Sequence, residues 1–382
     1  MRVLIFAYAC NPDEGSEPGA GAAIVKAVSR AFPGAALTVL TRTLGSRTAA
    51  ELASELGANV EVIEVRTRPI RSTYGRYLFW LIAATRRARI MRSQTRYDVI
   101  HQATYASDWF VTPFHLMRKL PHERWVWGPA GGASYATSAV TRLVTQTSAV
   151  REVVRTVATR PFRAVTQRTA AKSVDAVIAM NEGSARGFRS AGFRRVEVFA
   201  NTVIDYSLLP ERAASTRGRL VYAGRGVNWK GLPFLISLLG GRPDLHLVIA
   251  GPETDTPYYR KLAQRSGASV EFVGALTRSE TMELLAGAQA LIFLSLHDSA
   301  GWTAAEAAGI GTPVVCLDLG GVSAMAGDAG IVVASAPAKT LAERVLVAIE
   351  SSARHSPSPS RAWSLERLSA RLAPVYSDGG RQ

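Results

Sequence analysis

Two acidic residues, Asp298 and Glu306, lie eight positions apart in the stretch HDSAGWTAAEAAGIGTPVV, with Gly301 between them. An apolar run, ALIFLSL, leads into this stretch, and its alanine-rich part reads as a helix. The first amides of a helix lack partners within the helix and, with the helix dipole, favour an anion such as a phosphate. Glu306 interrupts a helix expected to be buried, where an unpaired carboxylate is costly, so it needs a partner such as the vicinal hydroxyls of a ribose. Asp298, on the preceding loop, is expected to reach another part of the same ligand.

A second set of candidate binding residues lies in YAGRGVNWKGLPFLI, residues 222–236. Gly224 and Arg225 follow a predicted strand, and Lys230 comes just before a predicted helix. A guanidinium and an ammonium beside a helix N-terminus suit a diphosphate. The residues alone leave plainer alternatives open: two solvated cations here, and a helix-capping acid with an ordinary helical glutamate in the first stretch.

The elements that must position these residues alternate regularly along the chain. Short β-branched runs take turns with helical stretches in both halves, which predicts α/β domains with parallel sheets. The predicted strands are RVLIFAY, ALTVLTR, VEVIEV, DVIHQAT, WVWGP and DAVIAM in the first half and RLVYAG, LHLVIAG, VEFVG, ALIFLSL, PVVCLDL and GIVVA in the second.

Two breaks in composition divide the chain. FANTVIDYSLLPERAASTRG reads as a linker, and SSARHSPSPSRA is a Ser/Pro segment that cannot continue a helix. We therefore predict a Rossmann-like domain over residues 1–203, a second over 204–358, and a helix with a tail over 359–382. Ligands of such doubly wound sheets bind beyond the carboxyl ends of the strands, and a cleft between domains is a preferred place for them.

The overall composition limits the class of protein. The chain has 382 residues, 47% of them hydrophobic and 20% charged, which is ordinary for a globular protein with a real core. Its apolar runs fall short of the roughly 20 residues that cross a bilayer, and the run in MRVLIFAYAC is too short for a secretory signal. Cys10 and Cys316 have no metal-like spacing, so we expect reduced cysteines in a cytoplasmic protein.

The net charge of +15 is unevenly distributed. Residues 1–205 hold 28 Lys and Arg against 15 Asp and Glu, whereas residues 206–382 hold 17 against 15. Two segments are strongly basic: residues 66–96 contain nine arginines and no acid, and residues 142–172 contain seven basic residues and one glutamate. Basic residues interleaved with apolar ones fit a helix lying on an anionic membrane, so we predict peripheral contact on its inner face. The plainer alternative is a solvated basic face; no motif for nucleic-acid recognition accompanies the charge.

Several of these motifs occur in the order seen in one enzyme family. GRGVNWKG, VIAGPE, the block from VEFVGAL to GTPVV, and GGV resemble the retaining glycosyltransferases of family 4, also called group 1, which have the GT-B fold. FANTVID resembles the family's interdomain segment, and AWSLERLSARLAPVY its last helix, which crosses back to the N-terminal domain. The resemblance implies two Rossmann-like domains that face a cleft, and transfer of a sugar from a nucleotide-diphosphate sugar to a glycan, lipid-linked or small-molecule acceptor.

The resemblance also implies a role for each matching residue. Arg225 and Lys230 would hold the donor diphosphate, and Glu306 matches the second glutamate of the family's Glu–seven residues–Glu motif, which binds the ribose. Asp298 falls where the first glutamate belongs, and it is one methylene shorter. The implied catalytic residues are Asp298, Arg225, Lys230 and His101, and the implied donor-binding residues are Glu306, Gly301, Trp302, Ser299, Gly224 and Leu276. The resemblance implies no metal, and no cofactor besides the nucleotide-sugar co-substrate.

The first half contributes candidate loops for the acceptor. YACNPDEGSEPGAGAAIV places Gly15, Gly19 and Gly21 after the first predicted strand, where the backbone can approach a phosphate or a sugar closely. The loop resembles that of a bacterial subgroup of the family, which carries a GSEPGxG loop and an HDSxGW motif. DVIHQATY and WGPAGG resemble the same subgroup, so His101 becomes a candidate for contacting the transferred sugar and Gly131 and Gly132 form another cleft loop.

The sequence leaves two other functions open. A sugar-nucleotide 2-epimerase shares the two-domain fold but needs no acceptor. A non-catalytic, membrane-associated carbohydrate-binding relative would carry Asp298 as its lesion. Glu253 and Asp255, which follow a predicted interior strand, are the one acidic pair that suggests a metal, and we expect none there.

Overall fold

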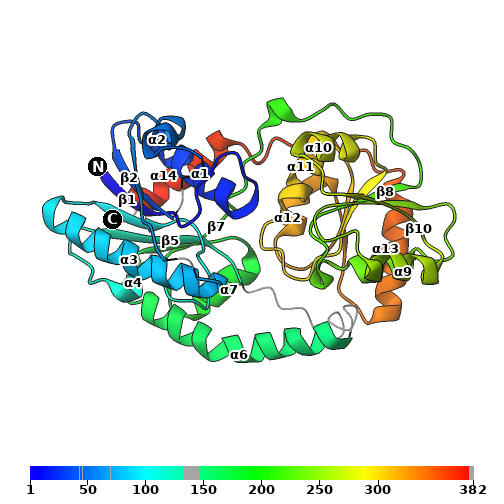
Figure 1. The fold of residues 1–382 in the computed structure, drawn as a ribbon, viewed down its shortest axis with the longest axis horizontal. Coiled ribbons are helices and arrows are strands. Elements are labelled where there is room, and N and C mark those ends of the chain that lie inside the picture. The colour runs from blue at the N-terminus through cyan, green and yellow to red at the C-terminus, as the bar shows by residue number, and fades with distance from the viewer. Residues whose placement is uncertain (43, 45, 69, 133–145, 378–382) are drawn as a thin grey trace. The chain divides into compact units, whose positions relative to one another are not determined.

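The computed structural model describes residues 1–42, 44, 46–68, 70–132 and 146–377, and Figure 1 shows it as a ribbon. These residues form two compact units. The first comprises residues 1–132, 159–203 and 364–377, and the second comprises residues 146–158 and 204–363. The chain leaves the first unit after Val203 and returns to it at Ser364.

The first unit is built on a parallel sheet of seven strands in the order β3-β2-β1-β4-β5-β6-β7. The strands are β1 Arg2–Phe6, β2 Ala36–Thr41, β3 Val60–Glu64, β4 Val99–Gln102, β5 Arg124–Ala130, β6 Ala176–Ala179 and β7 Val196–Val198. The helices are α1 Ser16–Ala31, α2 Ala49–Leu56, α3 Thr73–Gln94, α4 Pro113–Leu116, α7 Glu182–Ser190 and α14 Leu365–Tyr376. Helix α6, Gln146–Ala170, has residues in both units.

Both faces of this sheet are covered, because successive side chains of a strand point to opposite faces. In β1, Val3 and Ile5 join one buried cluster, whereas Leu4 and Phe6 join another. The first cluster includes residues of α1, and the second includes Trp80 of α3 and residues of α7. Strands buried on both sides explain why the runs in the sequence are continuously apolar rather than alternating.

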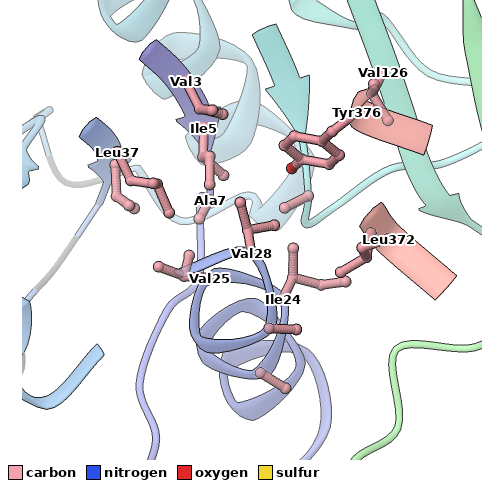
Figure 2. Packing of buried hydrophobic residues seen from close by; sticks show 14 of the residues in the cluster. Val3, Ile5, Ala7, Ile24, Val25, Val28, Leu37, Val126, Leu372 and Tyr376 are labelled. Atoms are coloured by element: carbon pink, nitrogen blue, oxygen red, sulfur yellow. The ribbon is translucent and has the colours of Figure 1, made fainter. Parts of the chain in front are cut away.

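Helix α14 supplies part of the first unit's core although it comes from the end of the chain. Leu372, Val375 and Tyr376 are buried in the same cluster as Ile24 and Val28 of α1, and Figure 2 shows the two helices' side chains meeting beneath β1. Ser364 caps the helix by accepting a hydrogen bond from the backbone of Arg367. The predicted C-terminal helix that crosses back to the N-terminal domain is therefore confirmed.

The second unit repeats the same architecture with six parallel strands in the order β10-β9-β8-β11-β12-β13. The strands are β8 Arg219–Ala223, β9 His246–Ala250, β10 Ser269–Gly274, β11 Ala290–Phe293, β12 Val314–Leu317 and β13 Gly330–Val333. The helices are α8 Leu232–Leu238, α9 Pro257–Ser266, α10 Arg278–Ala286, α11 Trp302–Ile310, α12 Val322–Ala326 and α13 Ala338–Ser352, with short 3-10 turns at Tyr206–Leu208, Asn228–Lys230 and Gly327–Ala329.

The predicted fold class of two doubly wound α/β domains is confirmed. Each of the twelve runs named in the sequence overlaps one observed strand. The sequence missed β7, which has three residues and lies at the edge of its sheet, too short for a pattern to stand out. Within the part of the chain that the structure describes, every helix is too short or too polar to cross a bilayer.

Candidate donor site

Several predicted donor residues of the second unit lie at the point in its sheet where the order of successive strands reverses. From β8 the chain builds outward to β9 and β10 on one side, then crosses to β11 and β12 on the other. The loops after β8 and β11 therefore leave neighbouring strand ends at the point where doubly wound sheets bind ligands. The loop after β8 carries Gly224, Arg225 and Lys230, and the loop after β11 carries Asp298.

Lys230 and Asp298 form the centre of this site. The Lys230 Nζ lies 3.4 Å from Asp298 Oδ2, and the two side chains are 19% and 18% exposed. The ammonium also lies 5.4 Å from the ring centroids of both Trp229 and Phe293. A backbone hydrogen bond from Leu296 to the Trp229 carbonyl, 3.0 Å long, ties the two loops together. The cation is thus held in a largely desolvated place, where a charge interaction is stronger than in water.

One carboxylate oxygen of Asp298 accepts no hydrogen bond from the described residues. Asp298 Oδ2 is buried and has no hydrogen-bond partner among the described residues, so the long contact with Lys230 is its main compensation. Buried carboxylate oxygens normally accept a hydrogen bond, and an exception calls for an explanation. Hydroxyl groups of a ligand at this position would supply the missing donors.

Two glycines, Gly224 and Gly231, lie next to Lys230. A Cβ at Gly224 would lie 3.5 Å from the Lys230 ammonium. Gly231, next to Lys230, has φ +75°, and a Cβ there would meet the Leu294 carbonyl oxygen at 2.6 Å. Only glycine accommodates that backbone conformation and that approach at low cost. Gly231 therefore helps to set the lysine beside Asp298, whereas a Cβ at Gly224 would make only an ordinary contact with it.

Arg225 points to a different carboxylate. Its Nε lies 3.5 Å from Glu253 Oε1, and both side chains are more than half exposed. An exposed pair of this kind contributes only about 0–1 kcal/mol, so it holds Arg225 weakly. Arg225 and Lys230 are therefore paired with different carboxylates. Asp255, the other acid of the suspected metal pair, forms its own ion pair with Arg260.

Glu306 is buried on α11 and has a protein partner that the sequence did not reveal. The Nε and Nη2 of Arg278 lie 3.1 and 3.0 Å from Glu306 Oε1. Burial raises the pKa of Glu306, and Arg278 opposes that rise. Both Arg278 contacts are to Oε1, which leaves Oε2 available for a ligand hydroxyl. Arg278 is the first residue of α10, after the Thr277 cap; an arginine at a helix start carries no signal that it serves a distant acid.

Nucleotide-diphosphate binding should depend on whether the Glu306 carboxyl is ionised or protonated, and therefore on pH. Because burial raises its pKa, we expect nucleotide-diphosphate affinity to fall as pH drops through a window above the usual glutamate range, as the protonated group loses an acceptor. Glu306→Gln should bind about tenfold more weakly at neutral pH and lack this dependence. The stability of the fold responds in the opposite direction. Because the folded state binds this proton more tightly than the unfolded state, the free energy of unfolding of the wild type should increase relative to that of Glu306→Gln as the pH drops through the same window. Calorimetric titrations and thermal unfolding of both proteins test this, and parallel pH profiles would contradict it.

The remaining predicted donor residues border these groups. Gly301 precedes the first residue of α11, Trp302, and a Cβ at Gly301 would lie 3.3 Å from Val322. The Asp298 carbonyl accepts a 2.9 Å hydrogen bond from the Gly321 amide, and a Cβ at Gly321 would meet the Ser299 carbonyl oxygen at 2.0 Å. The half-buried Leu276 lies in the loop before Arg278. This close backbone packing fixes the turn that leads into α11.

His101 differs from its predicted role. The side chain is fully buried in β4, its Nδ1 contacts the Tyr376 hydroxyl, and its Nε2 contacts the Gly128 carbonyl. Desolvation lowers the pKa of His101 to about 4, so the ring is neutral at physiological pH. With both ring nitrogens engaged inside the first unit, His101 positions α14 and β5, and this geometry does not offer it to a sugar.

The glycines of the first unit also need correction. Gly19 and Gly21 lie inside α1 rather than in the loop before it, and Gly15 is its N-cap. A Cβ at Gly21 would meet the Ala9 carbonyl oxygen at 2.1 Å, so this glycine lets the helix pack against the preceding loop. Gly131 bridges to Ser107, and Gly132, with φ +129°, leaves room for Asp108. Of the five glycines, three remain in loops at strand or helix ends.

One segment of the chain matches a protein-family model. Residues 210–361 match the family described as "Glycosyl transferases group 1". This segment, which is less than half of the chain, is similar to group 1 glycosyltransferases. It lies within the second unit and contains Lys230, Arg278, Asp298 and Glu306. The ion pairs of these residues therefore lie in the segment that is similar to group 1 glycosyltransferases.

Known proteins show further similarities to this chain. Over 171 residues the chain is 28% identical to the uncharacterized glycosyltransferase YqgM of Bacillus subtilis (strain 168). The aligned part covers 43% of this chain and 48% of YqgM. The chain thus spans about half the length of the curated relative it matches. The structure resembles sucrose-phosphate synthase from Thermosynechococcus elongatus with a TM-score of 0.65 and 15% identity, over 98% of this chain and 94% of that one. It also resembles HepE of Anabaena, solved with UDP and glucose, with a TM-score of 0.57 and 18% identity, over 98% and 99% of the chains. At these identities the likeness shows the fold alone, which is GT-B.

Proposed function

We propose that the protein transfers a sugar from a nucleotide-diphosphate sugar to a hydroxyl-bearing acceptor, with retention of configuration at the anomeric carbon. The observation that carries this proposal is the Lys230–Asp298 pair at the ends of β8 and β11. It lies in the segment that matches group 1 glycosyltransferases. Retention is inferred from the family resemblance of the motifs, and the reaction is proposed to need no metal and no further cofactor.

Each group has a role in this reaction. The bond between the anomeric carbon and the diphosphate oxygen breaks, and the oxygen of an acceptor hydroxyl forms a new bond to the same face of that carbon. The proton of this hydroxyl passes to the departing diphosphate, on which negative charge develops. Lys230, together with the first amides of α11, stabilises that charge, which is the largest contribution to catalysis in many enzymes. Oε2 of Glu306 accepts hydrogen bonds from the ribose, and Asp298 accepts them from hydroxyls of the transferred sugar. Arg225 can leave its weak pair with Glu253 and join the diphosphate.

A panel of nucleotide-diphosphate sugars tests the proposal. UDP-glucose comes first, because HepE has been solved in complex with it. We expect thermal stabilisation by at least one donor, slow hydrolysis of that donor, and faster turnover once an acceptor is added. Conversion of the donor to an isomeric nucleotide-sugar without an acceptor would instead identify a 2-epimerase. Donor binding with no turnover by any acceptor would identify a non-catalytic relative.

We further propose that α6 makes peripheral contact with an anionic membrane. Its side chains at Val150, Val153, Val154, Val157 and Val165 are 49–64% exposed, and their spacing places them on one stripe of the helix. Arg160 and Arg168, also exposed, lie along the same helix. An apolar stripe with basic residues on a protein of net charge +15 suits a surface of anionic lipid. The part of the predicted basic segment before Gln146 lies outside the described residues.

In the other predicted basic segment, residues 66–96, three arginines are bound by neighbouring groups. Arg92 pairs with the buried Glu123 at 2.6 Å, Arg89 donates to the Leu116 carbonyl, and Arg66 pairs with Glu64. Arg92 and Arg89 connect α3 to its neighbours, whereas the Arg66 side chain is 85% exposed. Arg86 and Arg87 of α3 are also exposed, as are the side chains of Tyr74, Phe79 and Ile90, so α3 is a second candidate for the membrane contact.

Flotation with liposomes of anionic phospholipid tests the membrane contact. We expect binding at low salt that falls as salt rises, because screening weakens the attraction. Val154→Asp, which puts a charge in the apolar stripe of α6, should abolish most of it. Val347→Asp, at an equally exposed valine of α13, is the matched control and should float like the wild type. Absence of wild-type flotation at low salt would contradict the proposal.

A further inference from the structure

The first unit contains a pocket that the donor site does not explain. Its volume is about 170 Å³, and it lies among the loop after β1, the ends of β2 and β4, and the start of α3. The residues that line it include Tyr8, Asn11, Glu14, Arg42, Arg76 and Tyr105. Because the carboxyl ends of parallel strands meet at one edge of a sheet, this is the ligand-binding edge of the first unit. The volume is below the roughly 300–1,000 Å³ typical of pockets for drug-sized ligands, so the pocket suits one sugar unit.

Two guanidinium groups in this pocket lack a carboxylate partner among the described residues. Arg42 lies 5.2 Å above the ring of Tyr8 and forms no ion pair with a described residue. Arg76 donates a weak 3.4 Å hydrogen bond to Thr73, and its Nε is buried without a hydrogen-bond partner in the described part of the chain. A buried donor left without an acceptor costs free energy, and a planar guanidinium is well suited to a carboxylate or phosphate.

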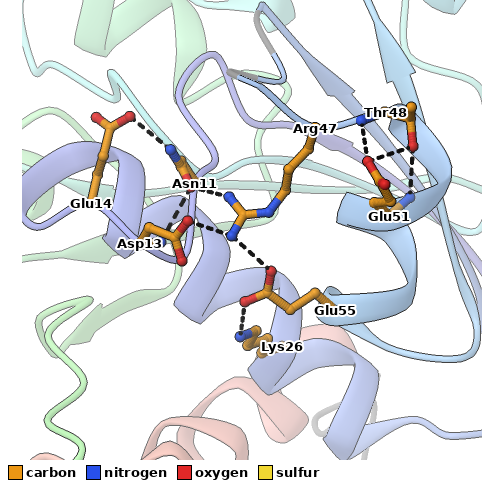
Figure 3. Close-up of polar contacts among 8 residues, drawn as sticks. All are labelled: Asn11, Asp13, Glu14, Lys26, Arg47, Thr48, Glu51 and Glu55. Atoms are coloured by element: carbon orange, nitrogen blue, oxygen red, sulfur yellow. Dashed lines mark hydrogen bonds and ion pairs between the residues drawn. The ribbon is translucent and has the colours of Figure 1, made fainter.

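Other charged residues near the pocket do have partners, in contrast to Arg42 and Arg76. Arg47, in the same region, pairs with Asp13 and with Glu55, and it also donates to Asn11 (Figure 3). Glu14 is bound by the Asn11 side-chain amide at 2.7 Å. The acids of the glycine-rich loop are therefore engaged with other groups. Burial raises the pKa of Tyr105, and the nearby charges of Arg42 and Arg76 oppose that rise.

The aromatic wall of the pocket is rigid. The Tyr105 ring lies 4.5 Å from Tyr8 and 5.4 Å from Tyr77, centroid to centroid. Its backbone has φ +51°, an unfavourable value for a tyrosine. The Tyr105 amide donates to the carboxylate of Glu17, which holds this conformation. A strained residue kept in place by its surroundings is a feature of ligand sites, and the C–H face of a sugar ring packs on such an aromatic surface.

We propose that this pocket binds the acceptor as a single sugar unit that carries an anionic group, a phosphate or a carboxylate. Arg42 and Arg76 bind the anion, Tyr8 and Tyr105 pack against the ring, and Glu14 and Asn11 contact its hydroxyls. The proposal rests on the proposed function, since it gives the chemical class of that reaction's acceptor. The anion can belong to a sugar phosphate or to a uronic acid, and binding measurements with both classes separate these two sources.

Calorimetric titration of the full chain, without donor, tests the proposal. The ligands are the 6-phosphates of glucose, galactose and mannose, the corresponding uronic acids, the neutral hexoses and inorganic phosphate. We expect at least one anionic sugar to bind at least about tenfold more tightly than its neutral hexose and than inorganic phosphate. Preference for the phosphates or for the uronic acids identifies the source. Equal binding of neutral and anionic sugars, or binding of none of them, would overturn the proposal.

Variants assign the binding to this pocket. Arg42→Met and Arg76→Met should each weaken binding of the anionic sugar about tenfold or more, as expected for loss of a hydrogen bond to a charged group. Arg87→Met, an exposed arginine three turns further along α3, is the matched control and should change nothing. UDP affinity should be unchanged in all three. Retained sugar affinity in the Arg42 and Arg76 variants would place the anion elsewhere. Because this binding is measured without turnover, failure to find any transfer would refute the proposed function and leave the pocket's ligand established.

Discussion

Lys230→Ala is expected to lower the rate of sugar transfer by about 10²–10³-fold, the range seen when a group that stabilises developing charge is removed. The Lys230 side chain is only 19% exposed and its ammonium lies 5.4 Å from the centroids of two aromatic rings, so water cannot replace its charge efficiently. Affinity for the nucleoside diphosphate should fall by about tenfold or more, because the lost contact is charge-assisted. Steady-state kinetics and calorimetric titration with UDP, or with the nucleotide of the donor that the panel identifies, measure both effects.

The fold must stay intact for this result to be informative. Removal of Lys230 leaves Asp298 buried without its cation, so Lys230→Met, which keeps the side chain's bulk, should be compared by thermal unfolding. Lys261→Ala, an exposed lysine of α9, is the matched control for the loss of one positive charge from the second unit. If Lys230→Ala unfolds normally and still binds the diphosphate with wild-type affinity, the donor site is wrongly placed.

The sequence predicts most of the fold because continuous apolar runs of β-branched residues signal strands buried on both faces. The two sheets and the break after Val203 follow from composition and spacing, whereas the return of the last helix to the first unit is implied by the family resemblance. Strand β7 does not, because a three-residue edge strand is stabilised by its neighbour β6 rather than by its own pattern. The start of α1 at Ser16 is equally hidden, since Gly19 and Gly21 read as loop residues and are tolerated in the helix for close packing.

The site is less predictable because its decisive contacts join residues far apart in the chain. Spacing identified Lys230, Asp298 and Glu306 as candidates, and the order of β8 and β11 in the sheet explains why the first two meet. Nothing local marks Arg278 as the partner of Glu306, which lies 28 positions later. For His101 the sequence instead suggested a contact with the ligand that the structure does not offer. The residue is fully buried, because two groups distant in sequence, the Tyr376 hydroxyl and the Gly128 carbonyl, contact its ring nitrogens. The pocket around Arg42 likewise combines separate segments, each unremarkable alone.

Asp298 decides whether this is a working variant of the family site or a damaged one. Asp298→Asn keeps the shape of the side chain and removes its charge. We expect sugar transfer to fall by about 10²-fold, because the carboxylate's contacts with the sugar are made where charge develops. Affinity for the free nucleoside diphosphate should stay the same or rise, since Asp298 no longer competes for the Lys230 ammonium 3.4 Å away. Loss of transfer and of diphosphate binding together would show that Asp298 acts only by positioning Lys230.

Asp298→Glu restores the side chain length found in the family motif and provides the contrasting variant. The added methylene would move the carboxylate within a space already bordered by Lys230, by the backbone of Gly321 and by the turn into α11. We therefore expect Asp298→Glu to transfer sugar more slowly than the wild type, since this turn is built for the shorter acid. Transfer kinetics of the three proteins with one donor and one acceptor measure this directly. If the glutamate variant exceeds the wild type, Asp298 is a lesion in the site, and the interpretation of HDSAGW as a functional variant fails.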